Sequence, residues 1–110
     1  MRIDRFSFGK IIIDGKEYNT DVFITGNSVE EKESSHTITK DDIDKALIEN
    51  PDIIIIGMGT TGMVRIPEEI RDIVAKNKIE LVEGKTSQAI EDFNKLRGKN
   101  KIVAIFHLTC

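Results

Sequence analysis

Four consecutive isoleucines, residues 53–56, are the feature of this sequence that most restricts its fold. They follow Pro51 and Asp52 and run directly into a glycine-rich segment. A strand that is apolar on both faces belongs inside a sheet that is covered on both sides. The closing segment KIVAIFHLTC has the same character, with apolar residues on both faces between residues 102 and 108. Both segments are therefore predicted to be interior strands.

Three helices are predicted from terminal signals and from apolar residues at helical spacing. Thr39 caps the first helix, with Asp42 in a capping-box-like role. Pro67 suits the first position of the second helix, and Thr86 is the expected N-cap of the third. The first helix is expected to end at about Asn50 before Pro51, the second near Lys78, and the third at Gly98.

The first third of the chain is predicted to be antiparallel β-structure. Strand-forming residues lie at 3–8 and 11–13, and Asp14-Gly15 is a strong hairpin signal before a return strand at Glu17-Tyr18. Further strands are expected at 21–25, closed by Gly26-Asn27, and at 79–82. Residues 26–37 are predicted to be a polar loop that includes the charged run 30–33. The order of elements indicates an α/β layered domain with a β-rich start.

The segment Gly57-Met58-Gly59-Thr60-Thr61-Gly62 matches G-x-G-x-x-G, the dinucleotide-binding fingerprint. Glu83 follows 21 residues after Gly62, near the place of a ribose-binding acid. In a true fingerprint the helix begins inside the glycine motif and points at the pyrophosphate. Pro67 puts the helix start about one turn too late, so dinucleotide binding is not expected. Two interpretations stay open: a strand-end turn that needs glycine, or a loop for a small ligand or an anion.

Gly84-Lys85-Thr86 follows a strand and precedes a helix, as the end of a P-loop does. A P-loop also needs a glycine five positions before its Gly-Lys pair, and Ile79 occupies that position. A turn glycine and an N-cap threonine explain the triplet, so no P-loop is predicted.

The two histidines and the one cysteine have no metal-ligand spacing, and no metal site is predicted from them. His107 lies on an apolar strand face, which is typical of a hydrogen-bonded core histidine. His36 is the stronger functional candidate because it lies in a polar loop before a helix. The sequence shows no partner for nucleophilic catalysis beside it. Cys110 cannot form a disulfide within the chain, while one between chains stays open.

Composition bounds the class of protein. A chain of 110 residues is expected to be one domain, residues 1–110, and is too short for two mononucleotide-binding halves. The net charge of −3, with acids and bases interspersed, gives no basic surface for nucleic acid. The amino-terminal segment has no apolar signal core, so a cytoplasmic protein without a membrane partner is expected. No nicotinamide, flavin or metal cofactor is expected.

The order and spacing of these pieces resemble a small α/β family of unknown function, over nearly the whole chain. The likeness is carried by SSHTITKDDIDKALIENPDIIIIGMGTTGMVRIPEEIRDIVAKNKIELVEGKTSQAIEDFNKL. The family was first known from an archaeal hypothetical protein, and it includes the adipogenesis-associated domain-containing protein and mitochondrial complex I assembly factor three. The resemblance implies a three-layer domain around a mixed β-sheet, with an N-terminal β-hairpin and a central C-terminal strand. The resemblance carries over no established catalytic activity. It does imply a shared pocket near Gly57-Met58-Gly59, where relatives commonly have Gly-Thr-Gly.

Two functions follow as hypotheses. The first is a binding or assembly module that acts on a protein partner or by self-association. The alternative is a small-molecule or anion-binding protein, enzymatic or not, with a pocket where the glycine loop and the next parallel strand end at one edge of the sheet. No catalytic residue is assigned. The candidate ligand-binding residues are Gly57, Gly59, Thr60, Thr61, Gly62, Glu83, Thr86 and His36.

Overall fold

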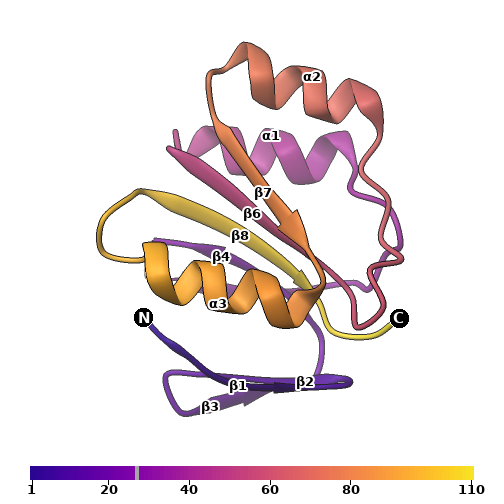
Figure 1. Cartoon of the computed structure of the whole chain (residues 1–110), viewed down its shortest axis with the longest axis vertical. Coiled ribbons are helices and arrows are strands. Elements are labelled where there is room, and N and C mark those ends of the chain that lie inside the picture. Colours follow the sequence, from indigo (N-terminus) through magenta and orange to yellow (C-terminus); the bar gives the residue numbers. More distant parts are fainter. Residues whose placement is uncertain (27) are drawn as a thin grey trace.

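The structure, a computed structural model, describes residues 1–26 and 28–110 (Figure 1). In chain order the elements are β1 (Ile3–Ser7), β2 (Lys10–Ile13), β3 (Lys16–Tyr18), β4 (Asp21–Thr25), β5 (Ser28–Lys32), α1 (Lys40–Ile48), β6 (Ile53–Met58), α2 (Glu68–Lys76), β7 (Glu80–Gly84), α3 (Thr86–Leu96) and β8 (Ile102–His107).

These elements form three layers, which confirms the expected α/β class. The middle layer is a mixed five-stranded sheet in the order β5-β4-β8-β6-β7, so the C-terminal strand β8 is central. Helices α1 and α2 cover one face of this sheet. Helix α3 and a separate three-stranded sheet, β1-β2-β3, cover the other face (Figure 1).

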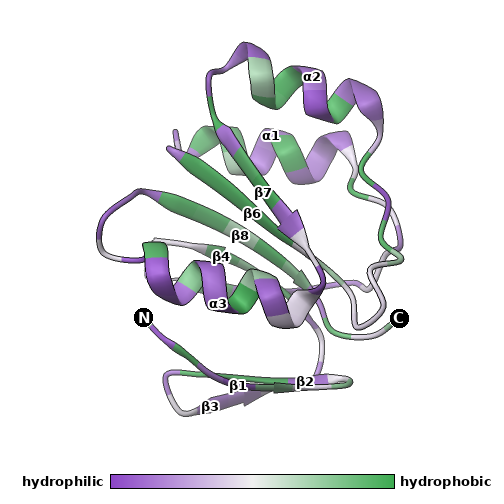
Figure 2. Ribbon diagram, in the orientation of Figure 1, coloured by the Kyte–Doolittle hydropathy of each residue, from purple (hydrophilic) through white to green (hydrophobic). Residues whose placement is uncertain are grey.

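Two hydrophobic cores lie on either side of the five-stranded sheet. Because side chains alternate along a strand, Ile53 and Ile55 of β6 pack beneath α3, while Ile54 and Ile56 pack beneath α1 and α2. Strand β8 divides its residues in the same way, and all of residues 102–107 are buried. Figure 2 shows both strands as largely hydrophobic ribbons between helices of mixed character. The prediction of two interior strands is confirmed.

The prediction of a polar loop over residues 26–37 was wrong for strand β5. Residues 28–32 pair antiparallel with β4, with Glu30 opposite Phe23 and Glu31 opposite Val22. Strand β5 lies at the sheet edge and is mostly exposed, so it has no apolar face that would identify it as a strand. Charged side chains on an edge strand also oppose pairing with other chains. Asn27, part of the expected turn, lies outside the described residues.

The helices begin close to the predicted signals. Thr39 caps α1, and its side chain and that of Asp42 form the complete capping box. Pro67 was expected to be the first helical residue of α2. It is instead the N-cap, and the helix begins one residue later, at Glu68. The prediction that Thr86 caps α3 was wrong: Lys85 has the N-cap position and Thr86 is the first helical residue. None of the helices in the described residues is long and apolar enough to cross a membrane.

The direction of the strands gathers several chain segments at one edge. Strand β6 runs parallel to both β7 and β8, so the carboxyl ends of all three lie at the same edge of the sheet. The glycine loop follows β6 there, and α3 begins there after β7. The last residues of the chain also leave β8 at this edge. Parallel pairing therefore brings these segments together.

The layered architecture predicts where backbone amides are best protected. Amides of β6 and β8 are expected to exchange with deuterium most slowly, because both strands have a partner on each side and a core on each face. Amides of the edge strand β5 should exchange orders of magnitude faster. Residue-resolved hydrogen exchange measures this, and equal rates in β5 and β6 would contradict the layered arrangement.

Candidate functional site

A single buried hydroxyl joins the segments at the carboxyl edge of the sheet. Thr86 is fully buried, and its Oγ1 donates a hydrogen bond to the carbonyl oxygen of His107 at 2.6 Å. The same oxygen accepts a hydrogen bond from the backbone N–H of Gly59 at 2.9 Å. The N–H of Thr86 in turn donates to the Gly59 carbonyl at 3.1 Å. The glycine loop, the start of α3 and the end of β8 are thus held as one unit.

Two of the motif glycines are explained by the close approach of these segments. A Cβ atom at Gly57 would lie 2.7 Å from Phe106 Cδ1 and 3.0 Å from Thr86 Oγ1. At Gly59 the φ angle is +99°, and a Cβ atom would lie 2.5 Å from the carbonyl oxygen of Thr109. Glycine is needed at both positions to admit neighbouring chain segments, whether or not a ligand binds.

The C-terminal segment, residues 108–110, lies against the glycine loop. The N–H of Thr60 donates to the carbonyl of Thr109 at 3.1 Å, and the hydroxyl of Thr61 donates to the carbonyl of Cys110 at 2.6 Å. This segment therefore packs beside Gly59. Ligand binding at this loop stays a prediction.

Glu83 pairs with Arg71 of α2 and makes no part of the contact between Gly59 and Thr86. Its carboxylate accepts two hydrogen bonds from the Arg71 guanidinium of α2, and the Nη2–Oε1 distance is 2.8 Å. Helix α2 and helix α3 lie on opposite faces of the sheet. The structure therefore groups Gly59 with Thr86 but does not group Glu83 with them. The hydrogen bonds from Arg71 lower the pKa of Glu83 below its ordinary value, against the opposing effect of burial.

His36 lies beside the chain that follows the glycine loop. Its carbonyl accepts a hydrogen bond from the N–H of Arg65 at 2.8 Å, and Thr37 forms a parallel bridge with Arg65. Gly62 has a φ of +76°, and a Cβ atom there would meet only Lys85 Cγ, at 3.6 Å. The imidazole of His36 is exposed, so the fold brings a polar, accessible side chain to this edge.

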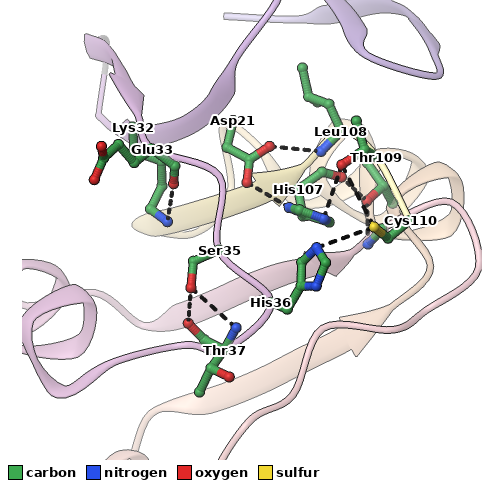
Figure 3. Close-up of polar contacts among 12 residues, drawn as sticks. Asp21, Lys32, Glu33, Ser35, His36, Thr37, His107, Leu108, Thr109 and Cys110 are labelled. Atoms are coloured by element: carbon green, nitrogen blue, oxygen red, sulfur yellow. Dashed lines mark hydrogen bonds and ion pairs between the residues drawn. The ribbon is translucent and has the colours of Figure 1, made fainter.

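The structure brings His36, His107 and Cys110 together, and we call these residues the histidine–cysteine cluster. Their ligand atoms all lie within 4.8 Å of one another. His36 Nε2 is 3.2 Å from Cys110 Sγ, and the two imidazole rings are 5.3 Å apart between centroids, at 82° to one another. Figure 3 shows both rings beside the cysteine sulfur. The cluster includes one exposed, one buried and one half-buried side chain.

Asp21 supports the cluster from within the core. It is buried on β4, and its Oδ2 lies 2.6 Å from His107 Nδ1 (Figure 3). Its Oδ1 accepts a hydrogen bond from the N–H of Leu108 at 3.0 Å. The prediction of a hydrogen-bonded core histidine at 107 is confirmed. Sequence reasoning did not identify Asp21 as a site residue, although a carboxylate that begins a strand as apolar as β4 needs a polar partner when buried.

The contact with Asp21 decides how His107 presents its other nitrogen. In the neutral form of the imidazole, a proton on Nδ1 shared with the carboxylate leaves the lone pair on Nε2. The hydroxyl of Thr109 lies 3.3 Å from this Nε2 and 3.9 Å from Cys110 Sγ. The cluster thus offers an oriented imidazole, a second imidazole and a thiol, which are groups that bind metal ions or react as nucleophiles.

A separate polar cavity lies near the amino terminus of α1. None of the sequence-predicted ligand-binding residues lines it. Its lining residues are Lys32, Glu33, Ser34, Ser35, Thr39, Asp41 and Asp42.

A comparison of two glycine variants tests the packing of the loop. Gly59→Ala is expected to lower the free energy of unfolding by about 1–3 kcal/mol more than Gly62→Ala. Both variants put alanine at a positive φ, but only the first forces a methyl group into the C-terminal segment. Urea titration measures both losses. Equal losses would show that the C-terminal segment does not pack against Gly59.

Because of the ion pair between Arg71 and Glu83, the difference in free energy of unfolding between wild type and Glu83→Gln is expected to depend on pH. The pKa of Glu83 is lowered in the folded state, so the pair stabilises the fold above the ordinary glutamate pKa of about 4.3. This contribution is lost as the pH falls through the lowered pKa. Glu83→Gln should cost about 0.5 kcal/mol at neutral pH, as is typical of a partly exposed ion pair.

Urea unfolding of wild type and Glu83→Gln at pH 7 and at acidic pH checks this expectation. Glu80→Gln, on the same strand but outside the ion pair, is the matched control. A difference between wild type and Glu83→Gln that persists unchanged below the lowered pKa would contradict the assigned role.

Comparisons with known proteins give a family but no activity. The chain is similar to the conserved hypothetical protein PH1505 from Pyrococcus horikoshii, with 31% identity, a TM-score of 0.91 and full coverage of both chains. It shares the fold of MT938, with 24% identity, a TM-score of 0.83, and coverage of 99% of this chain and 98% of that one.

A more distant match is a Mth938-like domain protein from Bordetella pertussis, with 12% identity and a TM-score of 0.70, covering 97% of this chain and 85% of that one. No curated protein matches the sequence. Residues 3–108 match the family described as "Protein of unknown function (DUF498/DUF598)". The chain therefore belongs to the DUF498/DUF598, or Mth938-like, family, for which no function is established.

Proposed function

We propose that this domain is a ligand-binding module whose binding site is the histidine–cysteine cluster at the carboxyl edge of the sheet. One observation carries the proposal: His36 Nε2 lies 3.2 Å from Cys110 Sγ, although the two residues are 74 positions apart in sequence. The fold thus joins an exposed imidazole to a half-buried thiol, above the buried imidazole of His107. The proposal is one of binding and includes no catalytic step.

The arrangement favours this site over the glycine loop itself. The carbonyl oxygens of Thr109 and Cys110 lie 2.5 and 2.8 Å from the position that a Cβ atom of residue 59 would take, so the chain itself fills this side of Gly59. A ligand that bound Gly59 from this side would have to displace the hydrogen bonds that these carbonyls accept from Thr60 and Thr61. A ligand of His36 and Cys110 displaces no backbone hydrogen bond.

The alternative form of this function, assembly with a protein partner or with a second copy, has less support. Three large apolar side chains are well exposed in the described residues: Phe8, Ile48 and Met63. They lie in the turn after β1, at the end of α1 and in the loop before α2. Binding energy at protein interfaces is usually concentrated in one desolvated cluster, and these positions do not provide one.

A stability screen tests the proposal. Wild-type protein and the variant His36→Gln/Cys110→Ser are heated with a panel of anions, neutral metabolites and metal ions. A ligand at 100 times its Kd is expected to stabilise wild type by about 2.7 kcal/mol. That stabilisation should be lost in the double variant, because the ligand's contacts are removed.

Gln88→Ala, on the exposed face of α3, is the control variant and should keep the full stabilisation. If no compound stabilises wild type, or if every stabilising compound acts equally on the double variant, the cluster is not the binding site.

A further inference from the structure

We propose that the ligand of this site is a borderline or soft transition-metal ion such as Zn²⁺, held by His36 Nε2, His107 Nε2 and Cys110 Sγ. The inference rests on the proposed function, because it names the chemical class of ligand for the same cluster. It departs from the sequence-based expectation of no metal, which considered only spacing along the chain. The tertiary structure brings these three ligand atoms within 4.8 Å of one another.

The chemistry of the donor atoms selects the class of ion. Two imidazoles and one thiolate form a nitrogen and sulfur set, which suits Zn²⁺, Co²⁺ or copper ions. Magnesium and calcium require oxygen ligands. Among the residues in Figure 3 the nearest buried carboxylate, Asp21, already contacts His107 Nδ1 and the N–H of Leu108. The site therefore discriminates against the hard cations.

The distances are close to those of a tetrahedral site. Zinc lies about 2.0–2.1 Å from nitrogen and about 2.3 Å from sulfur, so tetrahedral ligand atoms are about 3.5 Å apart. The separation of 3.2 Å between His36 Nε2 and Cys110 Sγ is already near this value. The upper bound of 4.8 Å for the cluster requires ligand atoms to approach by at most about 1.3 Å. His36 is exposed and Cys110 is half-buried, so both have room to make this adjustment.

The relation between the two rings supports the same conclusion. Two imidazoles that bind one tetrahedral ion through their ring nitrogens have centroids about 5 Å apart. The observed separation of His36 and His107 is 5.3 Å, with the rings nearly perpendicular. An edge-to-face contact alone gives a similar distance, but it does not account for the cysteine sulfur beside both rings.

Asp21 completes the arrangement by orienting one of the ligands. Metal-binding histidines commonly donate their other N–H to a carboxylate, which fixes the tautomer and orients the ring. Asp21 Oδ2, at 2.6 Å from His107 Nδ1, does this and leaves Nε2 directed to the cluster. The hydroxyl of Thr109, 3.3 Å from that Nε2, would be replaced by the ion. A core hydrogen bond explains the Asp21–His107 pair by itself, but not the convergence of His36 and Cys110.

The charges also balance in the bound state. A bound transition metal requires the thiolate form of the cysteine. The thiolate of Cys110 and the carboxylate of Asp21 together offset the two positive charges of Zn²⁺ in a partly buried place. Three protein ligands leave one coordination position open for water or for a ligand atom of a partner.

Cobalt is the probe that tests the site directly. Reduced, metal-free protein without a histidine tag is titrated with Co²⁺ and followed by visible and near-ultraviolet absorption, and then with Zn²⁺ in competition. We expect one Co²⁺ per chain, intense tetrahedral d–d bands, a thiolate charge-transfer band, and complete displacement by Zn²⁺.

Variants assign the ligands. Cys110→Ser should abolish the charge-transfer band, and His36→Gln should weaken Co²⁺ binding at least tenfold. Both variants should stay folded, because His36 is exposed and Cys110→Ser replaces a half-buried thiol by a hydroxyl of similar size. Asp21→Asn should weaken binding about 10–100-fold without removing the charge-transfer band, as is typical when the carboxylate partner of a metal-binding histidine is replaced. Gln88→Ala should bind as wild type does.

The metal proposal is overturned if Co²⁺ and Zn²⁺ do not bind at one per chain, or if they bind Cys110→Ser and His36→Gln as tightly as wild type. The stability screen separates this failure from that of the proposed function. If another compound stabilises wild type but not His36→Gln/Cys110→Ser, the binding function stands and the ion is excluded. If no compound does so, both proposals fail.

Discussion

The buried hydroxyl of Thr86 is the contact on which the carboxyl edge of the sheet depends. It bridges the N–H of Gly59 and the carbonyl of His107, at 2.9 and 2.6 Å, in a place that water does not reach. Both backbone groups would lose this partner without it, and a buried polar group without a partner costs about 1–3 kcal/mol. This one side chain fixes where the glycine loop, α3 and the end of β8 meet.

The candidate site follows from that junction. Because β8 is held at His107, the residues after it run over the glycine loop, where Thr60 and Thr61 bind their carbonyls. Cys110 is carried to the exposed ring of His36. On the inner side, the antiparallel pairing of Val22 with Phe106 sets Asp21 of β4 beside His107. The cluster is thus a consequence of sheet order and of the space that the glycines leave.

Several parts of the fold could be predicted because neighbouring residues encode them. The isoleucines at 53–56 required cover on both faces, and the capping box of Thr39 and Asp42 marked a helix start. Strand β5 was missed because its pairing with β4 is made by backbone groups, while its side chains are charged and exposed. Thr86 was assigned as an N-cap because a threonine before a helix usually is one. Its burial against His107 is a tertiary contact that has no local signal.

The sequence by itself determined the class, the interior strands, the helix starts to within one residue, and the late opening of α2 that argues against a dinucleotide fold. Those features depend on periodicity, turn chemistry and caps, which act over a few residues. Only the tertiary structure decided why Gly57 and Gly59 are glycines, that Glu83 pairs with Arg71, and that Asp21, His36, His107 and Cys110 share one edge. Contacts that join residues separated by 74 or 86 positions are set by strand order and register, which no short segment of the chain specifies.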